Sequence, residues 1–257
     1  MKKIIVLLYM LLPCKVFSQD LNLKGFSPNY YQTGNLVGNI GYNLNVSSIS
    51  SLPQSISNKE YPAGQLHFVA QLLLIHKLSK HFTAGIGYAY GNHNIFGLKE
   101  TEDRLLGQVG YLHSLSKVNF IHRLRFEYRT PKNLQTNITD NASILRYQTY
   151  ATLPLYNPKD TKRGFYLSAS NELFWYLEGA SNGPVSSKNG VFEFSNVSED
   201  WVHLAGGYNM GNTRVELGYC FQALIRNKQL DLRYLNLAQL NVYITINWDD
   251  LQSWWYL

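Results

Sequence analysis

Arginine and glutamate recur at alternate positions along several stretches of the chain, so in extended segments their side chains share one face. With the glutamines at equivalent positions, this polar set comprises Arg104, Gln108, Arg123, Arg125, Glu127, Arg129, Arg146, Gln148, Glu172, Arg214, Glu216 and Gln222. Guanidinium groups form charge-assisted hydrogen bonds with carboxylates and with other anions. The set therefore predicts a network of ion pairs and hydrogen bonds, or alternatively a passage that attracts anions, because arginines outnumber glutamates.

Serine and histidine residues raise a further possibility, a lipid hydrolase. His113 and Ser114 are adjacent, so in a strand they point to opposite faces, whereas His122 falls among apolar residues of the next segment. A nucleophile must lie within about 2.6–3.2 Å of its base, which here requires a pair formed between neighbouring strands. The chain has no phosphate-binding loop and no nucleophile elbow. We expect no catalytic residues, and a lipid-modifying enzyme remains an alternative.

Metal and cofactor chemistry finds little support in the sequence. His81, His93 and His203 lack metal-ligand spacing, and two cysteines are too few for a disulfide scaffold or a multi-cysteine zinc site. We expect no metal and no cofactor.

The residues of the polar set can share a face because polar and apolar residues alternate along the chain with a period of two, as in β-strands. In the stretch 120–129, Arg123, Arg125 and Glu127 fall on one side, while Leu124 and Phe126 fall on the other. Similar segments lie near 35–48, 64–79, 82–93, 104–116, 119–130, 143–156, 165–178, 200–210, 213–225 and 235–248. Most are longer than the usual strand of about 5–6 residues and match the roughly 9–11 residues with which a tilted strand crosses a bilayer.

The connections between these segments alternate in length. Short turns lie at 79–81, 116–118 and 211–213, with a longer one at 157–164. On the other side lie the long polar loops 49–63, 94–103, 131–142, 179–199 and 226–234. This pattern is typical of an outer-membrane barrel with short periplasmic turns, an even number of strands and a periplasmic N-terminus. A secreted β-sandwich also alternates polar and apolar positions, but the strand lengths and the loop asymmetry count against it.

The predicted fold is thus all-β, a transmembrane antiparallel up-and-down barrel of about ten strands. Its apolar face meets lipid, because hydrocarbon offers no hydrogen-bond partners and the sheet must close on itself. A barrel of about eight strands encloses a lumen that its side chains fill, whereas about 16–18 strands leave a channel. Ten strands lie near the filled limit, so we expect the polar set to form a largely closed, charge-paired lumen.

The start of the chain predicts export. Lys2 and Lys3 precede the apolar run 4–12, which is too short to cross a bilayer, and 16–18 fit a cleavage site. We expect a signal peptide at 1–18 and a barrel domain at 19–257. A lipoprotein signal ending before Cys14 is the alternative, although Pro13 fits it poorly. Loss of three lysines with the signal lowers the net charge from +6 to +3, too small a value to indicate nucleic-acid binding.

Several short blocks resemble the bacterial outer-membrane family called domain of unknown function 2490. They are the runs 102–104, 122–129, 145–147, 153–155, 171–174 and 216–219, followed by Gln222. Family members typically carry an Asn-Arg pair before the eighth strand, where this chain has Asp200 and Trp201. The resemblance implies an outer-membrane β-barrel with no assigned activity. The signal ending in Ser18-Gln19 is similar to those of the Bacteroidota, which are Gram-negative.

The function expected from these patterns is that of a non-enzymatic outer-membrane barrel for envelope structure or binding. Its expected partners are outer-membrane lipid and the barrel assembly machinery that inserts it, with the specific ligand unknown. The alternatives are a small anion-preferring pore or transporter and the lipid-modifying enzyme. Loops 49–63 and 179–199 are the longest and are the expected contact surfaces.

Overall fold

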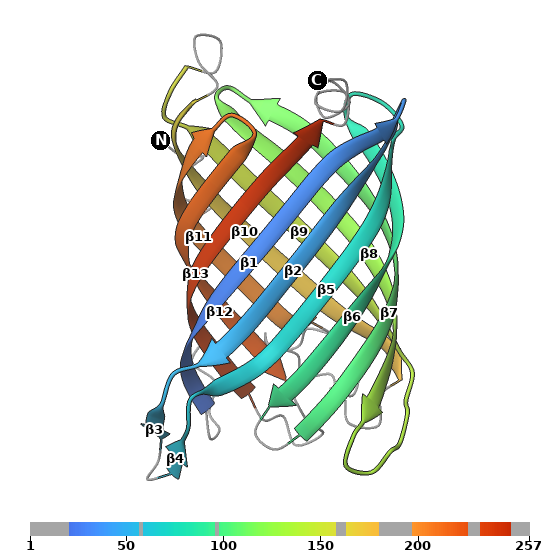
Figure 1. Cartoon of the computed structure of the whole chain (residues 1–257), viewed down its shortest axis with the longest axis vertical. Helices are drawn as coiled ribbons and strands as arrows, with labels where there is room; N and C mark the ends of the chain where they lie inside the picture. The colour runs from blue at the N-terminus through green and yellow to red at the C-terminus, as the bar shows by residue number, and fades with distance from the viewer. Residues whose placement is uncertain are drawn as a thin grey trace, which may run out of the picture.

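The computed structural model describes residues 21–56, 59–95, 98–157, 163–179, 197–225 and 232–247. Within these ranges, eleven strands close into one barrel, and a separate two-stranded hairpin projects from one end (Figure 1). The described residues include no helix long and apolar enough to cross a membrane. The all-β barrel expected from the alternation is confirmed, whereas the predicted signal peptide lies outside the described residues.

The strands are long and follow one another around the wall. Their bounds are β1 Leu21–Val37, β2 Ile40–Ser51, β3 Gln54–Ile56, β4 Lys59–Tyr61, β5 Gly64–Lys77, β6 Phe82–Ile95, β7 Leu98–Leu115, β8 Val118–Asn133, β9 Ala142–Pro154, β10 Arg163–Gly179, β11 Val197–Met210, β12 Thr213–Ile225 and β13 Leu232–Asn247. From β2 and β5 through β13, every neighbouring pair in the barrel is antiparallel. The short β3–β4 hairpin lies in the connection between β2 and β5.

The two ends of the barrel differ in their connections. At one end lie the two-residue turns 38–39, 116–117 and 211–212. Gly38 and Gly211 adopt positive φ values of 54° and 99°. Glycine tolerates such values better than any other residue, so it suits these tight turns. The opposite end carries the β3–β4 hairpin and the connection 134–141 (Figure 1), and it is also the end at which β6 is followed by β7, β10 by β11 and β12 by β13. We call these the short-turn end and the long-loop end.

The two faces of the wall are chemically opposite. On β8, Leu124 and Phe126 are 42% and 44% exposed on the outside, while Arg125 and Glu127 are 3% and 0% exposed. The outer face carries many other exposed aliphatic side chains, including Ile86 at 70%. The buried charged side chains therefore point into the lumen, where clusters of buried leucines also lie, and exposed apolar side chains cover the outside, the arrangement expected of a barrel that faces lipid.

The expected even strand count is wrong, because the barrel has eleven strands. The sequence interpretation placed a first strand at 35–48, but the structure has β2 there and a preceding strand, β1. β1 pairs antiparallel with β2 and parallel with β13, and the parallel pair closes the barrel. Its first residue lies at the long-loop end, so the expectation that the first strand starts at the short-turn end is also wrong (Figure 1).

The sequence does not predict β1, because few of the inward-facing residues of this strand are apolar. Its buried positions include Gly25, Ser27 and Asn29, which do not resemble the core side of a strand. Pro28 argues further against a central strand, since it has no N–H to donate. The register with β2 runs from Phe26–Ser50 directly to Asn29–Ser47, so the antiparallel ladder passes over Pro28.

The prediction of a loop at 94–103 is also wrong. β6 extends to Ile95 and β7 begins at Leu98, so the connection is only residues 96–97. Glu102 consequently lies within a strand.

Candidate functional site in the barrel lumen

A single carboxylate organises the middle of the lumen. Glu127 on β8 is fully buried, and its oxygens lie 2.5 Å from Arg129 Nη2 and 2.6 Å from Arg146 Nη1. Arg125 and Arg104 approach the same carboxylate at 3.7 and 3.9 Å. Four guanidinium groups from β7, β8 and β9 thus surround one negative charge, which offsets the cost of burying it.

A second carboxylate extends this cluster around the wall. Glu172 on β10 accepts hydrogen bonds from Arg123 Nη2 at 3.0 Å and from Arg146 Nε at 3.1 Å. Arg146 therefore bridges Glu127 and Glu172. The arrangement predicts that removing either carboxylate leaves Arg146 with only one anionic partner.

Arg125 carries the network across the lumen. Its Nη2 donates to Gln108 Oε1 on β7 at 2.8 Å, and its Nη1 donates to Gln71 Oε1 at 2.8 Å. Gln71 belongs to β5, which two strands separate from β8 in the wall. The Gln71–Arg125 hydrogen bond therefore spans the interior rather than following neighbouring strands.

Sequence reasoning missed the third carboxylate of this cluster. Glu102 Oε2 accepts from Arg104 Nη2 at 2.7 Å and lies 2.8 Å from His93 Nε2. Its Oε1 lies 3.6 Å from Arg129 Nε, and His93 Nδ1 contacts His67 Nδ1 at 2.9 Å. Glu102 shares the parity of Arg104, which was the available signal, but it was assigned to a loop.

Glu216 forms a separate cluster toward the short-turn end. Its Oε1 accepts from the Tyr150 hydroxyl at 2.8 Å, and its Oε2 accepts from Asn241 Nδ2 and the Tyr243 hydroxyl, both at 3.0 Å. Asn29 on β1 donates to Asn241 at 2.8 Å. The Tyr150–Glu216 contact skips β10 and β11 and so passes through the lumen, whereas Glu216, Asn241 and Asn29 lie on the neighbouring strands β12, β13 and β1.

The remaining members of the polar set lie apart from these carboxylates. The Arg214 guanidinium stacks 4.6 Å from the Tyr243 ring centroid. Gln222 is buried and its amide lies 3.9 Å from the Cys220 sulfur. Gln148 pairs in register with Arg123 and Glu172 on the neighbouring strands. The structure thus brings eight of the twelve residues into one central network, made of Arg104, Gln108, Arg123, Arg125, Glu127, Arg129, Arg146 and Glu172. The other four, Gln148, Arg214, Glu216 and Gln222, lie outside it.

The family model described as "Protein of unknown function (DUF2490)" matches residues 57–233, which is more than half of the chain. The chain belongs to the DUF2490 family. The resemblance seen in the sequence blocks is thereby confirmed. Among curated proteins, none matches the chain.

Solved structures similar to this DUF2490 barrel include a porin and two receptors. The NanC porin is 12% identical, with a TM-score of 0.43, and the match covers 82% of this chain and 94% of the porin. The siderophore receptor PirA from Pseudomonas aeruginosa is 10% identical, with a TM-score of 0.30, covering 79% and 35% of the respective chains. A mutant ferric enterobactin receptor, PfeA, from the same organism is 14% identical, with a TM-score of 0.30, covering 74% and 35%. The chain thus spans about a third of either receptor.

The departure from the DUF2490 pattern falls on the inner wall. Trp201 packs against Phe174 with ring centroids 4.7 Å apart, and its Nε1 donates to Glu199 Oε2 at 3.1 Å. Arg146 lies over the Phe174 ring at 4.3 Å. An aromatic pair therefore lies beside the central network, at the position where the resemblance noted in the sequence leads us to expect an arginine.

The serine and histidine considered for hydrolysis lie apart. The Ser114 hydroxyl donates to Asn119 Oδ1 at 2.7 Å. His113 and His122 stack 5.1 Å apart, and His122 Nδ1 contacts the Tyr147 hydroxyl at 2.9 Å. In the described ranges, no three histidine, cysteine or acidic side chains form a group that could hold a metal.

Proposed function

We propose that this protein is a non-enzymatic outer-membrane β-barrel whose lumen is closed to steady ion flow and which serves binding or envelope structure. The observation that carries the proposal is the pair of polar bridges across the lumen. One joins Gln71 of β5 to Arg125 of β8, and the other joins Tyr150 of β9 to Glu216 of β12, so each skips two strands of the wall.

The outer surface supports the membrane assignment. Aliphatic side chains such as Leu72, Leu105, Leu167 and Leu217 are 49–68% exposed on the outer face of the strands. A continuous apolar exterior of this kind is unfavourable in water and suits an acyl-chain environment. The proposed partners are accordingly outer-membrane lipid and the barrel assembly machinery required for insertion.

The polar bridges support closure for an energetic reason. Opening a water-filled path would require Arg125 to leave Gln71 and Tyr150 to leave Glu216, and each hydrogen bond to a charged group contributes about 1.5–3 kcal/mol. Because these groups belong to strands held in the closed sheet, they have little freedom to move aside. The lumen is therefore proposed to hold isolated solvent pockets rather than a continuous channel.

Planar-bilayer recording of the purified full-length barrel tests this proposal. We expect no steady conductance in the wild type at any applied voltage. A steady open current in folded wild-type protein would refute the closed lumen.

A small anion-preferring pore is the second candidate, favoured by the arginine excess of the central network. It predicts anion-selective current that falls in Arg125→Ala and in Arg146→Ala. The matched control is Arg214→Ala, which removes a lumen arginine outside the central network. Equal current in all three variants would count against this candidate.

A further inference from the structure

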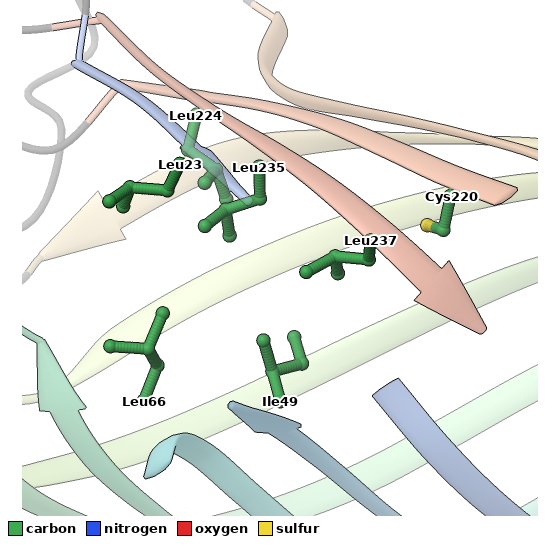
Figure 2. Packing of buried hydrophobic residues seen from close by; sticks show 7 residues of the cluster. All are labelled: Leu23, Ile49, Leu66, Cys220, Leu224, Leu235 and Leu237. Carbon is green, nitrogen blue, oxygen red and sulfur yellow. The ribbon is translucent and has the colours of Figure 1, made fainter. Parts of the chain in front are cut away.

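The lumen at the long-loop end has two unlike walls. One wall is apolar and brings together Leu23 of β1, Ile49 of β2, Leu66 of β5, and Leu224 and Leu235 of β12 and β13 (Figure 2). All five side chains are buried, at 1–7% exposure. The facing wall presents the charged network of β7, β8 and β9.

A cavity separates the two walls. Its volume is about 50 Å³, and it opens to solvent. Its apolar lining includes Leu66 and Leu235, and its charged lining includes Arg104, Arg129 and Arg146. So narrow a space suits one extended chain better than a bulky ring system or a folded peptide.

The apolar wall gives the cavity an affinity for hydrocarbon. Leucine and isoleucine side chains offer water no hydrogen-bond partners along this wall, so contact with an apolar guest is favoured over contact with water there. An alkyl chain that lies along these leucines would remove from water both its own apolar surface and that of the cavity wall.

The opposite wall gives the cavity its charge preference. Arg104, Arg129, Arg146, Arg233 and Glu199 are the charged groups of its described lining, apart from the histidines. With the groups that pair with them behind the lining, Arg123, Arg125, Glu102, Glu127 and Glu172, the described cluster holds six arginines and four glutamates, which leaves an excess of positive charge. Guanidinium groups recognise carboxylate and phosphate oxygens, so an anionic head group is the complement.

An aromatic pair marks the junction of the two walls. Phe174 and Trp201 both line the cavity, and the Arg146 guanidinium lies 4.3 and 5.8 Å from their ring centroids. The apolar surface therefore continues up to a charged group. This places the boundary between tail and head of a guest near Arg146.

We infer that this cavity binds a single-tailed anionic amphiphile, with its head group against the arginines and its alkyl chain along the leucines. The inference deepens the proposed binding role and rests on it, because the polar bridges beyond the cavity make it a dead end. The two proposals fail separately. A steady current would overturn the closed lumen, whereas absence of amphiphile binding would overturn only the present inference.

Equilibrium binding of radiolabelled dodecanoate to the full-length barrel in nanodiscs tests the inference, with protein-free nanodiscs subtracted. We expect saturable binding at one site per barrel. Shortening the acid should weaken binding about fourfold for each methylene lost from the apolar wall. Acetate, which has the head alone, should not bind detectably.

The head group is tested at constant tail length. Dodecanoate and dodecyl phosphate distinguish a carboxylate guest from a phosphate guest, and binding of either supports the inference. Dodecyltrimethylammonium should bind at least tenfold more weakly. Equal binding of the cationic amphiphile, or no difference between barrel-containing and empty nanodiscs, would overturn the inference.

Matched variants locate the site. Arg233→Gln should weaken dodecanoate binding at least tenfold, while Arg214→Gln, at the other end of the lumen, should leave it unchanged. Leu66→Asn should also weaken binding. Leu73 lies in a separate buried cluster, so Leu73→Asn should not weaken binding. Heat-modifiable gel migration verifies that each variant is folded. Equal affinity in all four folded variants would overturn the assignment to this cavity.

Discussion

Glu127 and Glu216 are both completely buried in the same lumen, yet they are held in opposite ways. Glu127 lies among four guanidinium groups, whereas the oxygens of Glu216 accept from two tyrosine hydroxyls and one asparagine amide. The long-loop half of the lumen thus balances charge with charge, while the short-turn half disperses one charge over neutral donors. The difference teaches that burial alone does not determine how sensitive a carboxylate is to substitution.

The largest effect should come from Glu127→Leu. This variant leaves Arg129 and Arg146 without their closest carboxylate, and an uncompensated buried charge costs about 3–5 kcal/mol. Urea unfolding in lipid vesicles measures the change in the free energy of unfolding. Glu172→Leu should destabilise less, because among the described residues only two guanidinium groups lie within 4 Å of Glu172, whereas four lie around Glu127. Wild-type stability in both variants would show that the ion pairs contribute little.

Paired substitution by glutamine tests the comparison directly. Glu127→Gln should cost about 3 kcal/mol, because it removes the charge that the arginines require while preserving the side-chain shape. Glu216→Gln should cost about 1 kcal/mol or less, since the amide oxygen can still accept and the Tyr150 hydroxyl can accept from the amide nitrogen. Thermal unfolding followed by gel migration gives both values. Equal losses at the two positions would mean that both halves of the lumen depend on charge to the same degree.

Tyr243→Phe sharpens the account of the neutral cluster. The variant removes one hydrogen bond to a charged acceptor, worth about 1.5 kcal/mol, and leaves the ring on which Arg214 stacks. Its loss should exceed that of Glu216→Gln, because a buried carboxylate oxygen then loses one of its two donors and keeps only Asn241. A smaller loss than in Glu216→Gln would show that Asn241 alone satisfies that oxygen. The same unfolding assay compares them.

The sequence predicted the local part of this arrangement and missed the non-local part. Alternation assigned Arg125, Glu127 and Arg146 to one face, because strand parity is set within a few residues. The place of Glu102 in a strand was not predicted, because the end of that strand resembles a polar loop. β1 was not predicted, because small and polar residues line its inner side.

The contacts across the lumen depend on closure of the barrel. The Gln71–Arg125 and Tyr150–Glu216 contacts join strands that are not neighbours in the wall. Which strands face each other is determined by the number of strands and their stagger. An expected even count could not give the facing pairs of an eleven-stranded barrel closed by β1 and β13.

The smallest effect should come from Leu124→Val on the outer face of β8. Leu124 lies between Arg123 and Arg125 in the chain but points away from the lumen and is 42% exposed. In a bilayer its side chain would contact acyl chains in the folded barrel, which adapt to the loss of one methylene, so the stability should change by no more than about 0.5 kcal/mol. Urea unfolding in vesicles, alongside Glu127→Leu, measures it. A loss at Leu124 as large as that at Glu127 would indicate that the outer face packs against protein rather than lipid.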